Sequence, residues 1–369
     1  MTDAGRKLRV VILGGGHGGL SVARALTKSG LADVKLVDGK GFFEINWATV
    51  RAPVEPDIGT SCIVDYADLI DSASFVRATV TAISSDKVVL NNGQSLPYDL
   101  AVFAVGTKHR DKFIQTGKGT AADRRRTFQD ARKQLEAAKT VLFVGGGPVG
   151  VEMAAEIATA MPGKTVVLAT SADRLLADQP KSLSASAAKA LKQYGVKVYL
   201  NEKVKEVQGG TGKFTLQSAG TEVQADLVYW CVGATAHTDW LKSSHPDVCN
   251  ERGLIKVDEY LRVKGHPNWF ALGDCADLPE TKLGYQAARQ GLEVAQSIKA
   301  VIQQGPETAR LTRHKPYTGM QAMILTLGKN NGAMHIAGWW VPWFLPTFLK
   351  SKDLFVKKTR HELGLSAPS

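Results

Sequence analysis

Apolar strands, glycine-rich turns and helices follow one another in the same order twice along this chain. Residues 10–13 are an apolar run that enters a glycine-rich turn, and a helical pattern at 20–28 and an apolar strand at 34–38 come next. The order returns at residues 140–144, where a second glycine-rich turn and a strand at 165–171 follow. A repeated strand–helix–strand order predicts two α/β units, each with a parallel sheet.

Further apolar segments return the chain to these sheets. We expect strands at residues 75–83, 87–90, 98–107, 225–235 and 269–277, and a helix with apolar positions at helical spacing at 282–303. The strands at 98–107 and 225–235 each reach a glycine near their end, Gly106 or Gly233, where we expect the chain to cross between the two units. The strand at 269–277 runs into Gly273 and Asp274, just before the long helix.

The two glycine-rich turns stand 131 residues apart and share the pattern G-x-G-x-x-G. In each, the first glycine allows a tight turn, the second lets the backbone approach a pyrophosphate, and the third lets the helix pack on the strand. The helix N-terminus then faces the phosphates. Two such turns in tandem predict two dinucleotides that face each other, a nicotinamide donor and a flavin acceptor. The turns consist of Gly14, Gly15, Gly16, His17, Gly18 and Gly19, and of Gly145, Gly146, Gly147, Pro148, Val149 and Gly150.

The strands that follow the turns distinguish the two ligands. Asp38 lies 19 residues past Gly19, where an acidic side chain can accept hydrogen bonds from ribose hydroxyls. The strand at 165–171 ends without a carboxylate, and Arg174 lies just beyond it. The missing carboxylate removes the repulsion that rejects a 2′-phosphate, and Arg174 is either a phosphate ligand or a solvated loop charge. We interpret the first site as that of FAD and the second as that of NADH or NADPH.

The order of segments predicts an α/β fold with two Rossmann-like dinucleotide-binding domains in a glutathione-reductase-like arrangement. The simplest topology inserts the NAD(P)H-binding domain into the FAD-binding domain. We expect the FAD-binding domain at 1–107 and 236–304, the NAD(P)H-binding domain at 108–235, and a small C-terminal α+β region at 305–369 that faces quinone and membrane.

Length, charge and cysteine usage narrow the class. A chain of 369 residues with 44% hydrophobic residues suits two or three globular domains, and no run approaches the roughly 20 apolar residues that span a bilayer. The polar N-terminus does not resemble a secretory signal. The four cysteines include no C-x-x-C pair, which argues for a reducing compartment and against a structural metal site or a redox-active disulfide.

The C-terminal 65 residues carry +6 of the net charge of +11. They also hold the run 336–349, with three tryptophans and two prolines, which is too short and too broken to span a membrane. Tryptophan and phenylalanine beside cations suit an interface with anionic lipid. Alternatively, these aromatics cover the flavin or form a homodimer contact. The residues concerned are Trp339, Trp340, Trp343, Lys350, Lys352, Lys357, Lys358 and Arg360.

The motifs resemble those of the pyridine nucleotide–disulfide oxidoreductase superfamily, and within it the quinone-reducing flavoproteins of the apoptosis-inducing-factor type. The most specific segments are 144–157, 271–277 and 350–356. The resemblance implies FAD, in some members 6-hydroxy-FAD, and flavin contacts at the first turn, Asp38, Lys40, Arg51, Val80, Gly106, Gly273 and Asp274. It implies nicotinamide contacts at the second turn and Glu152, and Arg174 and Gly233 are further candidates for this site.

The resemblance also implies a reaction. Hydride passes from NAD(P)H to flavin N5, and two electrons then reduce a ubiquinone-type quinone to the antioxidant quinol, which suppresses lipid peroxidation and ferroptosis. Lys350 and Lys352 are candidates for a positive field or for protonating the quinone, and Phe355 for packing beside it. We expect Arg51 to neutralise the pyrophosphate or, alternatively, to pair with Glu55 at the surface. Glu156 is expected to be solvated.

Relatives of this type act at the plasma membrane and at lipid droplets, and many carry a myristoylated glycine directly after the initiator methionine. This chain begins Met1-Thr2, so membrane residence would depend on the aromatic and basic segment, or the protein would stay in the cytosol. Two other readings remain open. One is a type II NADH dehydrogenase or sulfide:quinone reductase, and the other is a nucleic-acid-binding death factor that uses Arg124, Arg125, Arg126, Arg132 and Lys133. The cluster lacks interleaved aromatics, which argues against specific nucleic-acid binding.

Overall fold

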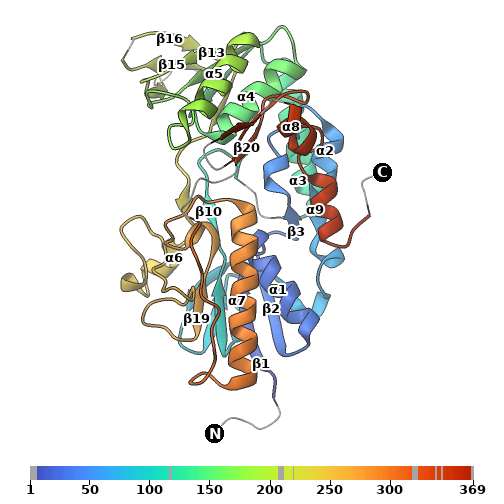
Figure 1. The fold of residues 1–369 in the computed structure, drawn as a ribbon, viewed down its shortest axis with the longest axis vertical. Helices are drawn as coiled ribbons and strands as arrows, with labels where there is room; N and C mark the ends of the chain where they lie inside the picture. The colour runs from blue at the N-terminus through green and yellow to red at the C-terminus, as the bar shows by residue number, and fades with distance from the viewer. Residues whose placement is uncertain are drawn as a thin grey trace.

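The computed structural model describes residues 6–115, 119–206, 212–218, 220–317, 323–336, 339–341 and 344–366. Two α/β lobes lie one above the other along the long axis, and the C-terminal segment packs along one side where they meet (Figure 1). The predicted fold class, two Rossmann-like halves, is confirmed. Among the described residues, no helix combines the length and the apolar character needed to cross a bilayer.

The lower lobe is built on a five-stranded parallel sheet in the order β19-β9-β1-β2-β5. Its central strands are apolar on both faces because both faces are covered, one by helices and the other by an antiparallel sheet and the segment 241–276. Helices α1 and α7 lie side by side against it (Figure 1). The elements are β1 (Leu8–Leu13), α1 (His17–Ser29), β2 (Ala32–Asp38), β5 (Phe75–Arg77), β9 (Leu100–Phe103), β19 (Trp269–Ala271) and α7 (Gly284–Gln304).

The upper lobe repeats this plan with a four-stranded parallel sheet in the order β13-β12-β11-β17. Helices α4 and α5 pack against it, and α3 leads into its first strand. The elements are α3 (Ala121–Ala137), β11 (Thr140–Val144), α4 (Pro148–Ala160), β12 (Thr165–Ala169), α5 (Lys181–Gln193), β13 (Lys197–Tyr199) and β17 (Leu227–Trp230).

Each lobe also carries a three-stranded antiparallel sheet, inserted in the chain between two of its parallel strands. These sheets are β6 (Val80–Ile83), β7 (Lys87–Leu90) and β8 (Ser95–Pro97) below, and β14 (Val204–Glu206), β15 (Lys213–Leu216) and β16 (Glu222–Gln224) above. The single strand expected at 75–83 is wrong, because the chain leaves the parallel sheet after β5 and begins β6 in the antiparallel sheet three residues later.

The two crossings between the lobes lie side by side. Strand β10 (Thr107–Lys108) pairs antiparallel with β18 (Thr235–Ala236), directly after Gly106 and two residues after Gly233. Both glycines have positive φ, 64° and 80°, a conformation that favours glycine. The predicted domain boundaries at 107/108 and 235/236 fall within this pair of strands. Their position supports the proposed division into domains.

The remaining elements shape the interface between the lobes. After α7, the chain makes a turn at 305–309 and has no regular secondary structure from there to 317. It then forms β20 (Met323–Thr326), β21 (Gly332–Ile336), β22 (Trp339–Val341), α8 (Phe344–Pro346), a π-helix (Thr347–Ser351) and α9 (Val356–Glu362). Shorter elements from earlier in the chain are β3 (Phe42–Glu44), α2 (Pro56–Ser61), β4 (Ile63–Asp65) and α6 (Asp239–Lys242). Trp343 and Pro342 lie outside the described residues.

Candidate active site

The two glycine-rich turns have the same local geometry. Gly14 and Gly145 both have positive φ, 101° and 121°, and each donates its N–H to a carbonyl near the end of the neighbouring strand, at 2.8 Å. A Cβ on Gly19 or Gly150 would overlap the carbonyl oxygen of Gly14 or Gly145, so the third glycine is required for the helix to begin so close to the strand. The fold itself therefore demands the first and third glycines of each turn.

The second glycine of each turn is not demanded by the fold. A Cβ built on Gly16 or Gly147 meets nothing within 4 Å, and neither residue has positive φ. Both are N-caps of their helices, and neither helix has a side chain that caps its first N–H groups. Open space beside uncapped backbone donors at a helix N-terminus fits a pyrophosphate, so both turns fit the dinucleotides that the sequence predicts.

Asp38 closes the first turn, at the end of β2. Its Oδ2 accepts the N–H of Gly15 at 2.6 Å and a hydrogen bond from Lys40 Nζ at 2.8 Å. Although burial alone would lower it, the nearby Asp38 and Tyr66 hold the pKa of Lys40 above its ordinary value. Tyr66, which the sequence did not single out, donates to the carbonyl of Gly15 at 2.5 Å and accepts from Lys40 at 3.2 Å.

Thr170 takes the place of Asp38 in the second turn. Leu13 pairs with Val37 in the lower sheet and Val144 pairs with Ala169 in the upper sheet, so the next residues, Asp38 and Thr170, are structural equivalents. A Cβ on Gly146 would lie 3.0 Å from Thr170 Cβ, in the way that Gly15 faces Asp38. The second turn therefore has no carboxylate at the position that Asp38 occupies in the first turn, as the sequence predicts.

Arg174 is neither a fully solvated charge nor free for a phosphate. Its guanidinium donates to the carbonyls of Leu176 at 3.1 Å, Gln179 at 2.8 Å and Ala177, all in its own loop. A role at a 2′-phosphate would require some of these hydrogen bonds to be exchanged. That role remains a prediction.

Asp274 lies at the other end of the lower site, on the short helical turn Gly273–Cys275 that follows β19. Gly273 has φ of 70° and donates its N–H to Gln290 Oε1 of α7 at 2.6 Å. Burial raises the pKa of the Asp274 carboxyl, and Lys282 and His109 oppose this. A half-buried carboxyl beside the start of α7 fits a partner with hydroxyl groups, such as a flavin ribityl chain. Val80, predicted near adenine, is a buried residue at the start of β6.

Glu152, Lys350 and the β20 strand meet in one buried contact. Glu152 Oε1 accepts hydrogen bonds from Lys350 Nζ at 2.8 Å, Thr326 N at 2.8 Å and Thr326 Oγ1 at 3.2 Å. Lys350 Nζ also donates to the carbonyl of Ile324 at 3.0 Å. Lys350 is therefore buried, with 8% of its surface exposed, whereas Lys352 is exposed.

Phe355 is held by an unusual turn. Leu354 and Phe355 both have positive φ, 55° and 56°, which costs non-glycine residues about 1 kcal/mol or more each. Leu354 is fully buried and Val356 is 1% exposed, so packing on either side maintains the turn. Lys358 Nζ lies 5.7 Å from the centroid of the half-buried Phe355 ring.

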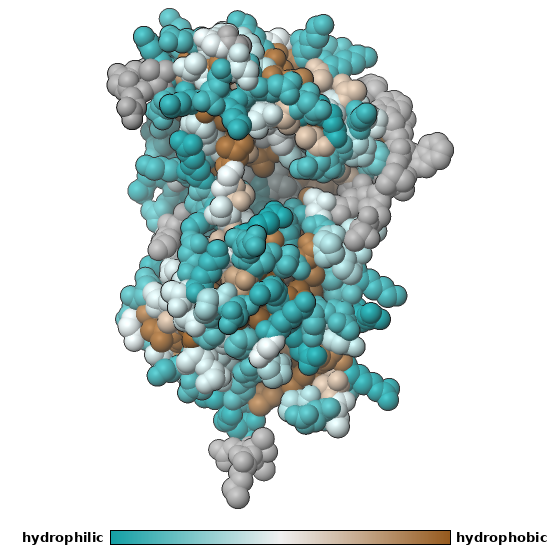
Figure 2. Space-filling model, turned by 90° about the vertical axis from the view of Figure 1, so that its left-hand side faces the viewer, coloured by the Kyte–Doolittle hydropathy of each residue, from teal (hydrophilic) through white to brown (hydrophobic). Residues whose placement is uncertain are grey.

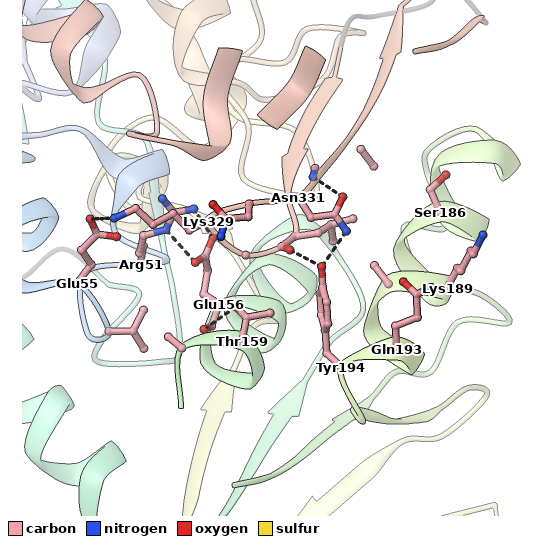
Figure 3. A pocket seen from close by; sticks show the side chains of 18 of the residues that line it. Arg51, Glu55, Glu156, Thr159, Ser186, Lys189, Gln193, Tyr194, Lys329 and Asn331 are labelled. Carbon is pink, nitrogen blue, oxygen red and sulfur yellow. Dashed lines mark hydrogen bonds and ion pairs between the residues drawn. The ribbon is translucent and has the colours of Figure 1, made fainter. Parts of the chain in front are cut away.

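The expected surface ion pair between Arg51 and Glu55 and the expected solvation of Glu156 are wrong, whereas the role of Arg51 at the pyrophosphate stays a prediction. Arg51 and Glu156 are 1% and 2% exposed, and Arg51 Nη2 lies 2.7 Å from Glu156 Oε1. Glu55 instead pairs with Lys329 across a cleft of about 1060 Å³ between α4, α5, α2 and the β20–β21 turn (Figure 3). None of the residues of the two glycine-rich turns lines this cleft.

The basic cluster proposed for nucleic acid is divided by the fold. Arg124 is 3% exposed and binds Glu44 through Nε at 3.0 Å and Nη2 at 2.8 Å. Arg132 donates to Glu136 and to the carbonyl of Val54. Buried and paired cations contribute little to a phosphate-binding surface, so this reading loses support.

The four cysteines form no disulfide. Cys62, Cys249 and Cys275 are buried and Cys231 is half-buried. Burial raises the pKa of the Cys275 thiol to about 11 and raises those of Cys62 and Cys231 as well. A reactive thiolate is favoured by the opposite shift, so these surroundings disfavour a nucleophilic cysteine.

The fold and the two turns define an oxidoreductase that uses FAD and NAD(P)H. The model of the pyridine nucleotide-disulphide oxidoreductase family matches residues 8–297. Ferroptosis suppressor protein 1 is 33% identical in Taeniopygia guttata and 31% identical in Homo sapiens, each over 98% of this chain and 97% of the relative. The chain therefore belongs to the pyridine nucleotide-disulphide oxidoreductase family.

One further relative is similar in sequence, and one solved structure is similar in fold. Apoptosis-inducing factor homolog B of Dictyostelium discoideum is 30% identical over 98% of both chains. The structure of NDH2 from Plasmodium falciparum in complex with NADH superposes with a TM-score of 0.73 at 17% identity, covering 96% of this chain and 97% of that one. The predicted resemblance to flavoproteins of the apoptosis-inducing-factor type is confirmed.

Proposed function

We propose that this flavin oxidoreductase passes electrons from NAD(P)H to a ubiquinone-type quinone. When bound, FAD supplies the two-electron chemistry, and the chain supplies binding, orientation and proton control. Relatives named ferroptosis suppressor protein 1 match nearly the whole chain, and the cysteines form no disulfide, so a diffusible acceptor is favoured.

The buried contact between Glu152 and Lys350 is the observation that carries the proposal. It joins the helix of the nicotinamide turn to the C-terminal segment at 2.8 Å, and the same segment carries exposed apolar side chains. Phe344, Phe348 and Leu349 are 59%, 71% and 39% exposed, and Lys352 Nζ lies 5.4 Å from the Phe348 ring centroid. One short stretch of chain thus links the cofactor helix to a surface that suits an apolar, ring-shaped acceptor.

Half-reaction kinetics test this assignment. In Lys350→Met, we expect NADH to reduce the flavin at close to the wild-type rate and a short-chain ubiquinone to reoxidise it at least about 100-fold more slowly, because a positioned proton donor contributes about 100- to 10,000-fold. Lys357→Met, which removes an exposed cation of the same segment, is the control. Wild-type protein that oxidises NADH without reducing any quinone would refute the proposal.

We further propose that the exposed C-terminal surface lies against anionic lipid, so that the quinone enters from a membrane or lipid droplet. A groove lined by Phe344, Leu345, Thr347, Phe348 and Lys352 lies on this surface, and Lys357 and Lys358 are exposed on the adjoining α9. Exposed aromatic side chains beside cations suit the lipid headgroup region.

Liposome flotation tests the lipid surface. Replacing Phe344 and Phe348 with Ser should reduce binding to vesicles containing phosphatidylserine, with turnover of a soluble quinone retained. Leu292→Ser, at an apolar position on α7 that is 51% exposed, is the matched control. Equal flotation of all three proteins would refute the lipid contact. In the same vesicles, NADH and ubiquinone should slow lipid peroxidation, as the quinol product is a radical-trapping antioxidant.

A further inference from the structure

Helix α4 carries two buried carboxylates one turn apart. Glu152 and Glu156 are 5% and 2% exposed and lie four residues apart, so they share one face of the helix. Each is neutralised by a cation from a different part of the chain, Lys350 in the C-terminal segment and Arg51 in the lower lobe. Two ion pairs therefore fix how three parts of the molecule meet on this helix.

Arg51 uses its whole guanidinium in this contact. Nε and Nη2 bind the two carboxylate oxygens of Glu156 at 2.8 and 2.7 Å, which is the bidentate geometry of the strongest arginine–carboxylate pairs (Figure 3). Nη1 points the other way and donates to the carbonyls of Ser351 at 2.6 Å and Lys352 at 3.4 Å. A lysine could not reproduce this fork.

The carbonyl of Ser351 has no hydrogen-bond donor within its own helix. Ser351 is the last residue of the π-helix, and the last carbonyls of a helix need partners from outside it. Arg51 supplies that partner and so caps the π-helix. The capped residue directly follows Lys350, which means that the guanidinium fixes the backbone one residue from the ammonium group bound to Glu152.

Stability alone does not account for this pair. Replacing a buried ion pair with apolar residues of similar size is often neutral or stabilising, whereas its directional hydrogen bonds can specify one arrangement of the chain. Here that arrangement joins the lower lobe, the nicotinamide-turn helix and the C-terminal segment at one group. Lys329 and Glu55, which join the lower lobe to the β20–β21 turn, form an exposed pair at 2.7 Å that has no comparable constraint.

We propose that Arg51 and Glu156 are positioning residues that hold Lys350 on Glu152, and that Arg51 is not a ligand of the flavin pyrophosphate. The inference rests on the proposed role of Lys350 in quinone reduction. Arg51 then affects quinone reduction through the position of Lys350. We call the Arg51–Glu156 ion pair, together with the hydrogen bonds from Arg51 to the carbonyls of Ser351 and Lys352, the clamp. Its disruption therefore releases Lys350 while the flavin stays bound.

A double-mutant cycle on the flavin-loaded protein tests this. Arg51→Met should keep its flavin and slow reoxidation by a soluble ubiquinone about 10- to 100-fold, because displacement of a reacting group by about 1 Å costs this much. Arg51→Met added to Lys350→Met should cause no further loss, and Arg51→Lys should fall between Arg51→Met and wild type. Lys329→Gln, which breaks the exposed pair beside the same cleft, should leave the rate unchanged.

Hydrogen exchange provides a readout that does not depend on activity. The amides of Lys352 and Leu354 bond to the carbonyls of Thr347 and Lys350. They should exchange at least about tenfold faster in Arg51→Met, since loss of the cap destabilises this segment locally. If Arg51→Met does not fold, Arg51→Met/Glu156→Leu, which leaves no unpaired buried charge, takes its place in both measurements.

Three results would overturn the clamp. The first is loss of flavin from Arg51→Met with unchanged amide exchange at residues 352 and 354. The second is that the rate reductions caused by Arg51→Met and Lys350→Met multiply in the double variant. The third is a rate reduction in Lys329→Gln equal to that in Arg51→Met. Should the wild-type protein reduce no quinone, the proposed function fails. The exchange experiment then still decides whether Arg51 holds the segment.

Discussion

The first phosphate turn is enclosed by other parts of the chain, whereas the second is more open. Gly15 packs against Tyr66, and a Cβ on Gly18 would overlap the Leu272 side chain and lie 2.9 Å from the carbonyl of Ala287 on α7. In the second turn, Gly146 is buried as Gly15 is, but Val149 in the place of Gly18 is only half-buried, and Pro148 in the place of His17 is exposed. Figure 2 shows one face of the molecule narrowing into a recess between the two lobes.

This difference matches two kinds of ligand. A cofactor that stays bound through every turnover is favoured by an enclosed site with a carboxylate such as Asp38. A nicotinamide substrate has to leave after each turnover, and a more open turn with Thr170 allows that. The same backbone motif therefore serves retention in one lobe and exchange in the other, and the surrounding chain decides which.

Matched substitutions of the second glycine should separate the two sites most sharply. Gly16→Asp places a negative charge in the first turn and should abolish flavin retention. Gly147→Asp should leave flavin bound but lower the rate of flavin reduction by NADH at least about a hundredfold, because like charges brought together cost several kcal/mol. Flavin absorbance and stopped-flow reduction measure the two effects.

Because a Cβ at either position meets open space, both variants should keep wild-type secondary structure. The comparison would fail if Gly147→Asp lost flavin to the same degree as Gly16→Asp. It would also fail if Gly147→Asp were reduced by NADH at the wild-type rate.

Thr170→Asp should convert the second turn toward the first. A carboxylate at this position can bind ribose hydroxyls and repels a 2′-phosphate, so kcat/KM for NADPH should fall about a hundredfold while that for NADH changes by less than about threefold. Ser171→Asp, one residue further and exposed, is the control. An equal loss with both nicotinamides would show that Thr170 does not face the ribose.

His17 should make the stability of the first turn depend on pH, which is a smaller difference between the turns, because the second turn has Pro148 in its place. Burial lowers the pKa of His17 from 6.5 to about 4. Between these values the unfolded chain binds a proton that the folded chain does not, so stability is complete above pH 6.5 and is lost as the pH falls toward 4.

In flavin-free protein, the free energy of unfolding should drop over this window by about 2 kcal/mol more in wild type than in His17→Gln. Urea denaturation at about pH 7 and about pH 4.5 measures the difference. Parallel losses in the two proteins would mean that His17 is protonated in the folded state.

Sequence patterns were sufficient for features that repeat locally. The spacing from Gly19 to Asp38 and the glycines before the crossings depend on strand, turn and helix geometry, which is set within about 30 residues. The equivalence of Asp38 and Thr170 could also have been found in this way, by counting from each turn in register.

Contacts between distant segments were not predictable in the same way. Arg51 and Glu156 lie 105 residues apart, and Lys350 lies 198 residues from Glu152. Glu156 looks solvated on an isolated helix, because Arg51, which pairs with it, and β20, which packs on α4, belong to distant parts of the chain. Such pairs depend on which faces meet after the lobes have formed, and no local spacing encodes that.

Strand β19 has a consequence for how the protein is made. It completes the lower sheet by pairing with β9, yet the ribosome adds it only after the entire upper lobe has been synthesised. Domains that are contiguous in sequence fold as they emerge, and the upper lobe meets that condition. The segment 8–103 must instead wait, with the β9 edge and the face of α1 that α7 later covers still exposed. Cells would therefore encounter this half first as an unfinished nascent domain that needs protection from aggregation.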